Sequence, residues 1–202
     1  HLYEDRQAEI LNILDECEKA GNPDIVFQFC STSKVSFPGA GIAAISASEA
    51  NIADIKNRLT IQTIGHDKIN QLRHVAFFKN IDGIRAHMMK QADIIRPKFE
   101  LVENLLNEEI APRGIGKWVS PLGGYFFGFE ALDGCAKQIV AKCKEAGVVL
   151  TGAGSPYPYK NDPKDSVIRI APTYPSKADL EEAAKVFVTV VRMVSVDKLL
   201  EK

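Results

Sequence analysis

The sequence predicts an α/β protein whose second part is a small α+β domain. Two apolar segments, residues 25–30 and 42–46, are short enough for strands, and the first is apolar enough for a buried central strand. After a long helical pattern over residues 82–109, short strands and helices alternate. We therefore divide the chain into residues 1–80 and residues 81–202, with the long helix as the connection.

In the first part, helical segments come before and after the two strands in the sequence. Gly21-Asn22-Pro23 ends the first helical pattern, because glycine and proline stop helices. The expected elements are a helix over 6–20, strands over 25–30 and 42–46, a helix with Ile52, Ile55 and Leu59 on one face, and a helix over 67–78.

The second part has the best-marked helix of the chain at its end. Ser176 is a typical N-cap with Asp179 three residues later, and an apolar stripe follows. Pro97 lacks a backbone donor and should kink the helix over 82–109. We expect strands at 117–120, 124–130, 148–151 and 167–171, a helix over 133–146, and a final helix with Leu180, Ala184, Phe187, Val191 and Val194 in the core.

Composition narrows the range of partners. The 202 residues are 46% hydrophobic and 25% charged, which suits a folded chain with a sizeable core. The net charge is −1 with scattered basic residues, so we expect no nucleic-acid partner and no anionic membrane surface. No apolar run approaches membrane-spanning length. Small molecules and a second copy of the chain remain as the expected partners.

The cysteines and histidines give no metal or disulfide pattern. Cys17, Cys30, Cys135 and Cys143 form no C-x-x-C pair, which suits free thiols in a reducing cytoplasm, the expected location. The histidines at 66, 74 and 87 are not at metal-ligand spacings, so we predict no metal site and assign structural or surface roles to His66, His74 and His87.

The most informative segment is Ser31-Thr32-Ser33-Lys34, which follows the first strand and precedes a glycine-rich turn at 37–41. Open α/β sheets bind ligands beyond the carboxyl ends of their strands. A lysine amine condenses with the aldehyde of pyridoxal 5'-phosphate, and neighbouring hydroxyls donate hydrogen bonds to its phosphate. The segment therefore indicates a pyridoxal-phosphate site, although Ser-x-Ser-Lys by itself also occurs in solvated turns.

This segment carries a family resemblance. Ser31-x-Ser33-Lys34 resembles the active-site signature of fold-type I pyridoxal-phosphate-dependent aminotransferases (class I/II), and Ile168-Arg169-Ile170-Ala171-Pro172 resembles a second family signature. The form Thr-Ser-Lys-x-x-Phe-Pro-Gly-Ala-Gly is most similar to a bacterial aspartate-aminotransferase-like group. The resemblance implies that residues 1–80 are the C-terminal part of the large cofactor-binding α/β domain, and that residues 81–202 are the connecting helix and the small α+β domain.

The resemblance also implies the roles of individual residues. Lys34 would form the Schiff base and carry the proton, while Ser31, assisted by Ser33, would bind the phosphate. Arg169 would hold the substrate α-carboxylate, which its planar fork matches with two hydrogen bonds. The implied reaction moves an amino group between an amino acid, aspartate in this group, and a 2-oxo acid such as 2-oxoglutarate, in a homodimer.

The resemblance places other family residues before residue 1. These are the aspartate that pairs with the pyridine nitrogen, a neighbouring tyrosine and a phosphate-binding glycine turn. We therefore expect the chain to be a C-terminal portion that is inactive by itself. Many members also carry an arginine eight positions after the lysine, where this chain has Ile42. Another cation, or backbone donors around residues 39–41, would have to bind the phosphate instead.

Other interpretations remain open. The same fold serves as a ligand sensor in transcription regulators, and as a decarboxylase or lyase. Periodicity alone favours an edge position for Arg169 with its head in solvent, and only the family resemblance selects a polar cavity. The segment Gly123-Gly124-Tyr125-Phe126-Phe127 resembles one that faces the substrate in the family, and is also an ordinary turn before a core strand. Residues 39–44 match a dinucleotide fingerprint formally, but a strand rather than a helix follows them.

Overall fold

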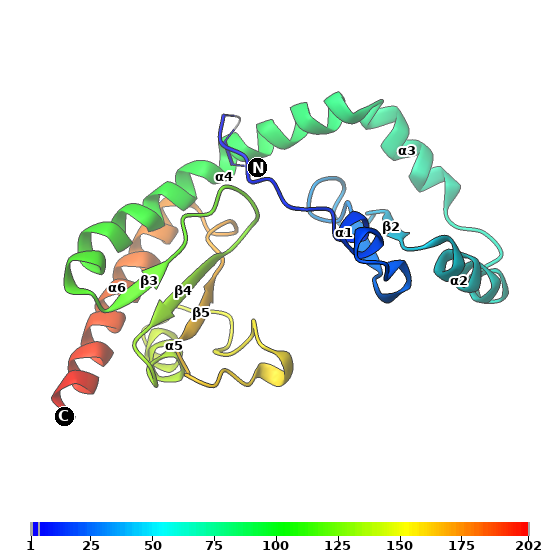
Figure 1. Cartoon of the computed structure of the whole chain (residues 1–202). Helices are drawn as coiled ribbons and strands as arrows, with labels where there is room; N and C mark the ends of the chain where they lie inside the picture. Colours follow the sequence, from blue (N-terminus) through cyan, green and yellow to red (C-terminus); the bar gives the residue numbers. More distant parts are fainter. Residues whose placement is uncertain (1, 4, 202) are drawn as a thin grey trace. The chain divides into compact units, whose positions relative to one another are not determined.

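The computed structural model describes residues 2, 3 and 5–201. The chain divides into two compact units (Figure 1). We call Ala8–Lys90 the N-terminal unit, and His1–Gln7 with Gln91–Lys202 the C-terminal unit. The boundary between them lies within one long helix, α4, which spans Ile81–Glu109. The functional division at residue 80 stays a prediction, because compactness alone does not test it.

The N-terminal unit is built around a two-stranded antiparallel sheet. Its strands pair from Gln28 opposite Ser46 to Ser31 opposite Ala43, so residues 32–42 connect the two paired ends. The elements are α1 (Ile13–Lys19), the short 3-10 helix η1 (Pro23–Ile25), β1 (Gln28–Ser31), β2 (Ala43–Ser46), α2 (Glu49–Gln62), α3 (Lys68–Phe78) and the first part of α4.

Local caps decide where the helices of this unit begin. The side chain of Asp67 accepts a hydrogen bond from the backbone N–H of Asn70, and α3 therefore begins where the sequence predicts. The predicted helix over 6–20 is wrong in its first half. The side chain of Asn12 accepts from the N–H of Leu14, so α1 begins only at Ile13.

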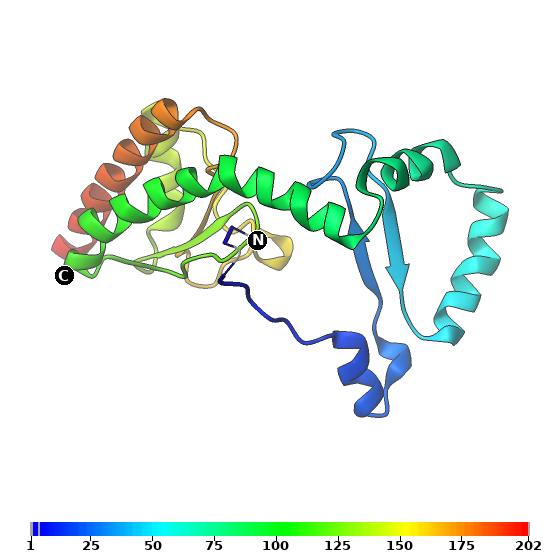
Figure 2. The same cartoon turned by 90° about the horizontal axis from the view of Figure 1, so that it is seen from above.

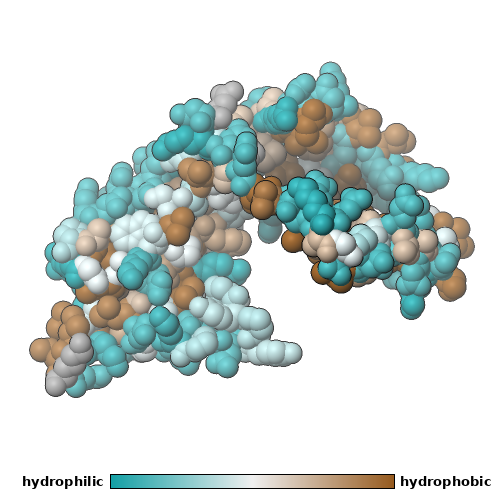
Figure 3. All heavy atoms as spheres, in the orientation of Figure 1, coloured by the Kyte–Doolittle hydropathy of each residue, from teal (hydrophilic) through white to brown (hydrophobic). Residues whose placement is uncertain are grey.

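The prediction that the first strand is buried and central is also wrong. All of β1 is exposed, and the side chain of Phe29 is 74% exposed. Within the described part of the chain, β2 is the only strand that pairs with β1. A two-stranded ribbon has too few neighbours to cover its own faces. Figure 3 accordingly shows hydrophobic residues on the surface of this unit.

The C-terminal unit packs helices against one face of a three-stranded antiparallel sheet in the order β3-β4-β5. Figures 1 and 2 show α4 and α6 running side by side in this unit. Its elements are the second part of α4, the 3-10 helix η2 (Ala111–Arg113), β3 (Gly116–Trp118), β4 (Phe127–Ala131), α5 (Ala136–Glu145), the 3-10 helix η3 (Pro158–Lys160), β5 (Val167–Ile170) and α6 (Lys177–Leu200).

Aromatic contacts join this sheet to two of the helices. Phe99 of α4 stacks on Phe127 of β4, with ring centroids 5.0 Å apart. Phe129 of β4 meets Phe187 of α6 edge to face at 5.2 Å. The residues that alternate with these on β4 point away from the helices and are exposed. Burial therefore alternates from residue to residue along β4, so that one face of the sheet packs against the helices and the other is exposed.

The final helix matches its prediction closely. Ser176 caps α6 by accepting a hydrogen bond from the N–H of Asp179, and the predicted stripe is buried. The helix α4 continues through Pro97, so the proline does not end it.

The predicted strand over residues 148–151 is wrong, because these described residues contain no strand. Val148 donates its N–H to the carbonyl of Cys143, and Gly147 donates to the carbonyl of Lys144. This pair of bonds is the Schellman motif that ends helices, with Gly147 at φ 87°. The backbone donor of Val148 is therefore used to close α5.

Candidate active site

Lys34 lies in the connection between β1 and β2, which we call the lysine loop (residues 32–42). Just before it, the hydroxyl oxygens of Ser31 and Ser33 are 2.7 Å apart, and Ser33 also donates its backbone N–H to Ser31 Oγ at 3.1 Å. All three residues are exposed. Two exposed hydroxyl side chains that contact one another therefore directly precede the lysine in the sequence, and phosphate binding by them stays a prediction.

Turns hold the lysine loop in shape. The backbone N–H groups of Val35 and Ser36 both donate to the carbonyl of Thr32 at 2.9 Å. A second turn is closed by the N–H of Ala40, which donates to the carbonyl of Phe37. This turn has proline in its second position and Gly39 at φ 75° in its third, the residues that a type II turn favours.

The two arms of the lysine loop touch at Gly41. A Cβ atom at this position would lie 2.6 Å from Ser33 Oγ and 2.9 Å from Ser33 Cα. Because Cβ atoms do not approach backbone atoms this closely, only glycine fits without moving Ser33. Ser33, the residue before the lysine, therefore packs directly against the backbone of Gly41.

The neck of the lysine loop is closed by Thr32 and Ile42. The N–H of Thr32 donates to the carbonyl of Ile42 at 2.8 Å, and the N–H of Ile42 donates to Thr32 Oγ1 at 2.9 Å. The side chain of Ile42 lines an apolar hollow together with Val75 and Phe78. These surroundings suit isoleucine at the position where many members of the resembled family carry arginine.

Arg169 lies on β5, in the C-terminal unit. Its neighbours Ile168 and Ile170 are buried on the helix side, so the predicted alternation is confirmed. Its cross-strand partner is Gly128, which leaves room beside it. The guanidinium carbon lies 4.5 Å from the ring centroid of Phe126, a cation–π contact.

The guanidinium of Arg169 has an unmet requirement. Its Nε is buried and has no hydrogen-bond partner among the described residues. No described Asp or Glu forms an ion pair with it. A buried donor without an acceptor costs free energy, so this position favours an anionic ligand over an exposed edge.

Asp162 fixes the start of the strand that carries Arg169. Its carboxylate accepts hydrogen bonds from the N–H groups of Lys164, Ser166 and Val167 at 2.8–3.0 Å. Burial pushes the pKa of Asp162 upward, but the backbone donors outweigh burial and lower the pKa below its usual value. The ionised carboxylate therefore anchors the first residues of β5.

Sequence reasoning missed two contacts of the site. Phe126 was left between a structural and a functional role, and it is the ring that supports Arg169. His74 was expected to be structural or at the surface. It is buried at 4% exposure, and it also contacts the lysine loop. Neither contact has a local signal, because each joins segments about 40 residues apart.

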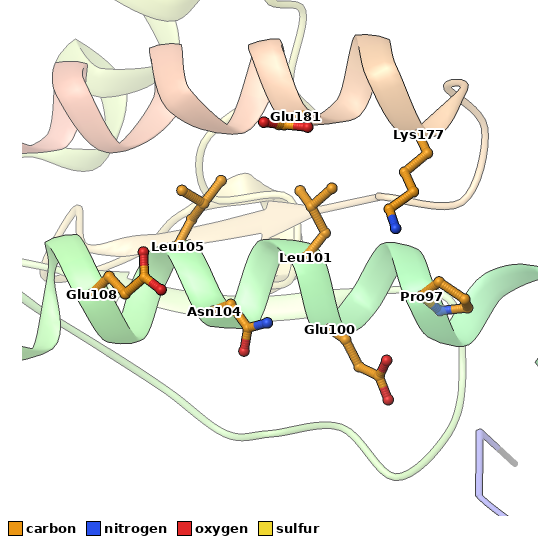
Figure 4. Close-up of a pocket in the computed structure, with 8 residues that line it drawn as sticks. All are labelled: Pro97, Glu100, Leu101, Asn104, Leu105, Glu108, Lys177 and Glu181. Carbon is orange, nitrogen blue, oxygen red and sulfur yellow. The ribbon is translucent and has the colours of Figure 1, made fainter.

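The residues present fit pyridoxal phosphate on the chemistry of their donors. The N-terminal unit places a lysine directly after two hydroxyl side chains in the sequence, and Gly41 packs closely against the second of them. By contrast, the groove between α4 and α6 is lined by the carboxylates of Glu100, Glu108 and Glu181 (Figure 4). Such a groove repels a phosphate and is not a candidate for this site.

Among the described residues, no group of three or more histidine, cysteine or acidic side chains is placed to hold a metal ion. The same residues contain no helix that is long and apolar enough to cross a membrane. All four cysteines are unpaired.

The chain matches the family model described as aspartate amino-transferase over residues 1–202. A Mycolicibacterium smegmatis protein named as an aminotransferase is 40% identical over 200 residues, or 99% of this chain and 47% of that protein. The solved structure of an aspartate transaminase from Corynebacterium glutamicum is 36% identical, with a TM-score of 0.92 over 98% of this chain and 46% of that one.

A more distant structure shares the fold. The α-aminoadipate aminotransferase of Thermus thermophilus, solved with N-(5'-phosphopyridoxyl)-L-leucine, is 17% identical, with a TM-score of 0.74 over 95% of this chain and 48% of that one. The chain spans about half the length of the relatives it matches. These likenesses confirm the expected fold class.

The close approach at Gly41 predicts a selective effect of adding one methyl group. Gly41→Ala should cost about 1–3 kcal/mol of stability, because the new Cβ forces Ser33 and its backbone to move. The matched control is Gly65→Ala, whose Cβ meets no described atom within 4 Å and should change stability by less than about 0.5 kcal/mol. Urea unfolding measures both, and equal effects would contradict the close approach.

Proposed function

The chain belongs to the aspartate aminotransferase family, and from this premise we propose that it is the C-terminal portion of a pyridoxal-phosphate-dependent aminotransferase that uses aspartate and a 2-oxo acid such as 2-oxoglutarate. The observation that carries the proposal is the lysine loop. Its exposed residue Lys34 follows, in the sequence, Ser31 and Ser33, whose hydroxyls are hydrogen-bonded to one another.

The cofactor supplies an aldehyde that accepts an amino group and a ring that accepts electrons. In the proposal, Ser31 would donate a hydrogen bond to its phosphate with the help of Ser33, and Lys34 Nζ would hold the cofactor through its aldehyde carbon. Ile42 offers no charge, so the backbone around residues 39–41, or a cation from elsewhere in the protein, completes phosphate binding.

Lys34 has two tasks in this proposal. Its Nζ would hold the aldehyde of the cofactor. Once the substrate amine has released it, Nζ would act as a general base toward the proton on the substrate α-carbon. One side chain thus serves first as an anchor and then as a base.

Arg169 orients the substrate. Its guanidinium fork binds the α-carboxylate through two parallel hydrogen bonds, and this supplies the acceptor that the buried Nε lacks. The ring of Phe126 restricts the guanidinium to one side. Aspartate is proposed from the family match and from the similarity to the Corynebacterium glutamicum transaminase.

The proposal extends to assembly and location. We propose that the complete protein is a homodimer in the cytoplasm, where free cysteines are stable. The N-terminal unit exposes apolar side chains, and this supports the proposal that a partner covers them. That partner is either the rest of the polypeptide or a second copy.

Replacing Lys34 tests the reaction. In the full-length polypeptide that carries this chain, Lys34→Ala should lower the rate of glutamate formation from aspartate and 2-oxoglutarate by at least about 100-fold, because the general base is lost. Lys56→Ala, an exposed lysine on α2, is the matched control and should leave the rate unchanged. A wild-type protein that binds the cofactor but forms no glutamate would contradict the aminotransferase proposal. Released carbon dioxide would then indicate a decarboxylase, and no turnover a sensor.

Replacing Arg169 tests the substrate contact. Arg169→Gln should raise the KM for aspartate by about 10- to 100-fold, because a charge-assisted pair of hydrogen bonds is lost. Arg169→Lys keeps the charge without the fork and should recover only part of the affinity. Arg58→Gln removes an exposed arginine paired with Asp54 and should have no effect. An unchanged KM in Arg169→Gln would return this residue to the solvent-edge interpretation.

A further inference from the structure

A buried histidine lies beneath the lysine loop. His74 belongs to α3 and is 4% exposed, although most of the N-terminal unit is open to solvent. Its ring packs edge to face against Phe37 of the loop at 5.3 Å. Phe37 in turn contacts Phe77 at 5.1 Å, so the imidazole is held in an aromatic pocket. The ring therefore keeps a fixed orientation toward the loop.

Hydrogen bonding determines which ring nitrogen carries the proton. Nδ1 of His74 lies 2.9 Å from the carbonyl oxygen of Asn70, which only accepts hydrogen bonds. The neutral ring therefore has its proton on Nδ1 and presents Nε2 as an acceptor. That acceptor lies 2.8 Å from Ser36 Oγ and 3.1 Å from Thr32 Oγ1.

These hydroxyls lie on either side of Lys34. Thr32 closes the neck of the lysine loop through its bonds with Ile42. Ser36 ends the turn that contains the lysine, and its oxygen is also 2.9 Å from the carbonyl of Thr32. One imidazole nitrogen thus lies against both ends of the five-residue turn.

The same helix contacts the glycine-rich arm. The side-chain amide of Asn70, one turn before His74, donates to the carbonyl of Ala40 at 2.8 Å. The helix therefore contacts the loop before the lysine, after the lysine and at the turn that packs against Ser33.

We propose that His74 is the positioning residue of the lysine loop: its Nδ1-protonated imidazole fixes Thr32 and Ser36 so that Lys34 and the two neighbouring hydroxyls are presented together to pyridoxal phosphate. The proposal rests on the proposed function for the identity of the cofactor. His74 acts through Ser36 and Thr32.

The first test compares two replacements of similar size in the full-length polypeptide. His74→Leu fills the space without an acceptor, while His74→Gln places an amide oxygen near the position of Nε2. His74→Leu should weaken pyridoxal-phosphate binding by about tenfold, the value of one hydrogen bond, and His74→Gln should recover most of the affinity. His66→Leu, at an exposed histidine, is the matched control and should bind as the wild type does.

Cofactor titration and thermal unfolding are measured on the same samples. If His74→Leu binds pyridoxal phosphate with the same affinity as the wild type, the inference is overturned and the proposed function stays intact, whatever the change in melting temperature. Loss of affinity in both His74 variants without recovery in His74→Gln would also overturn it, because packing alone would then explain the effect. If the wild type binds no pyridoxal phosphate, the proposed function fails, and with it the cofactor role of His74.

A second readout needs no cofactor. Nitrogen NMR of the cofactor-free protein should show the proton of His74 on Nδ1 and an unprotonated Nε2, and Ser36→Ala should shift the Nε2 resonance most among the histidines. A proton on Nε2, or no response to Ser36→Ala, would contradict the network even where cofactor binding is normal. This measurement separates failure of the inference from failure of the proposed function.

Discussion

The reciprocal hydrogen bonds between Thr32 and Ile42 are the constraint on which the candidate site depends. They close the neck of an eleven-residue connection between two short strands, so Lys34 lies in a compact turn. Within that turn the backbone of Gly41 packs on Ser33, and α3 contacts it from below. These contacts fix the backbone on both sides of Lys34, and a backbone that is already ordered lowers the entropy cost of binding a ligand.

Local signals in the sequence predicted the parts of the fold that local interactions determine. The cap at Ser176 and the buried stripe of α6 lie within one segment, and both were predicted. Alternation alone placed Ile168 and Ile170 opposite Arg169. Failures occurred where a distant or competing partner decides the outcome. The N–H of Val148 closes α5, which periodicity does not reveal.

For the candidate site, too, short motifs point to some residues, whereas contacts between distant segments could not be predicted. Lys34, Ser31 and Arg169 are candidates taken from two short motifs, and their roles stay predictions. The supports of these residues could not be read from the sequence, since Phe126 and His74 meet their partners across about 40 residues. The prediction that β1 is buried was wrong for a related reason. A strand can be apolar enough for a core, yet the described chain supplies only one neighbour for it.

Borohydride reduction in the presence of pyridoxal phosphate, followed by peptide mass mapping, tests the central claim most directly. In the full-length polypeptide, the account predicts one phosphopyridoxyl adduct, on Lys34, that disappears in Lys34→Ala. Labelling that spreads over surface lysines and is unchanged in Lys34→Ala would contradict the claim that the loop around Thr32 and Ile42 is built to present this lysine to the cofactor.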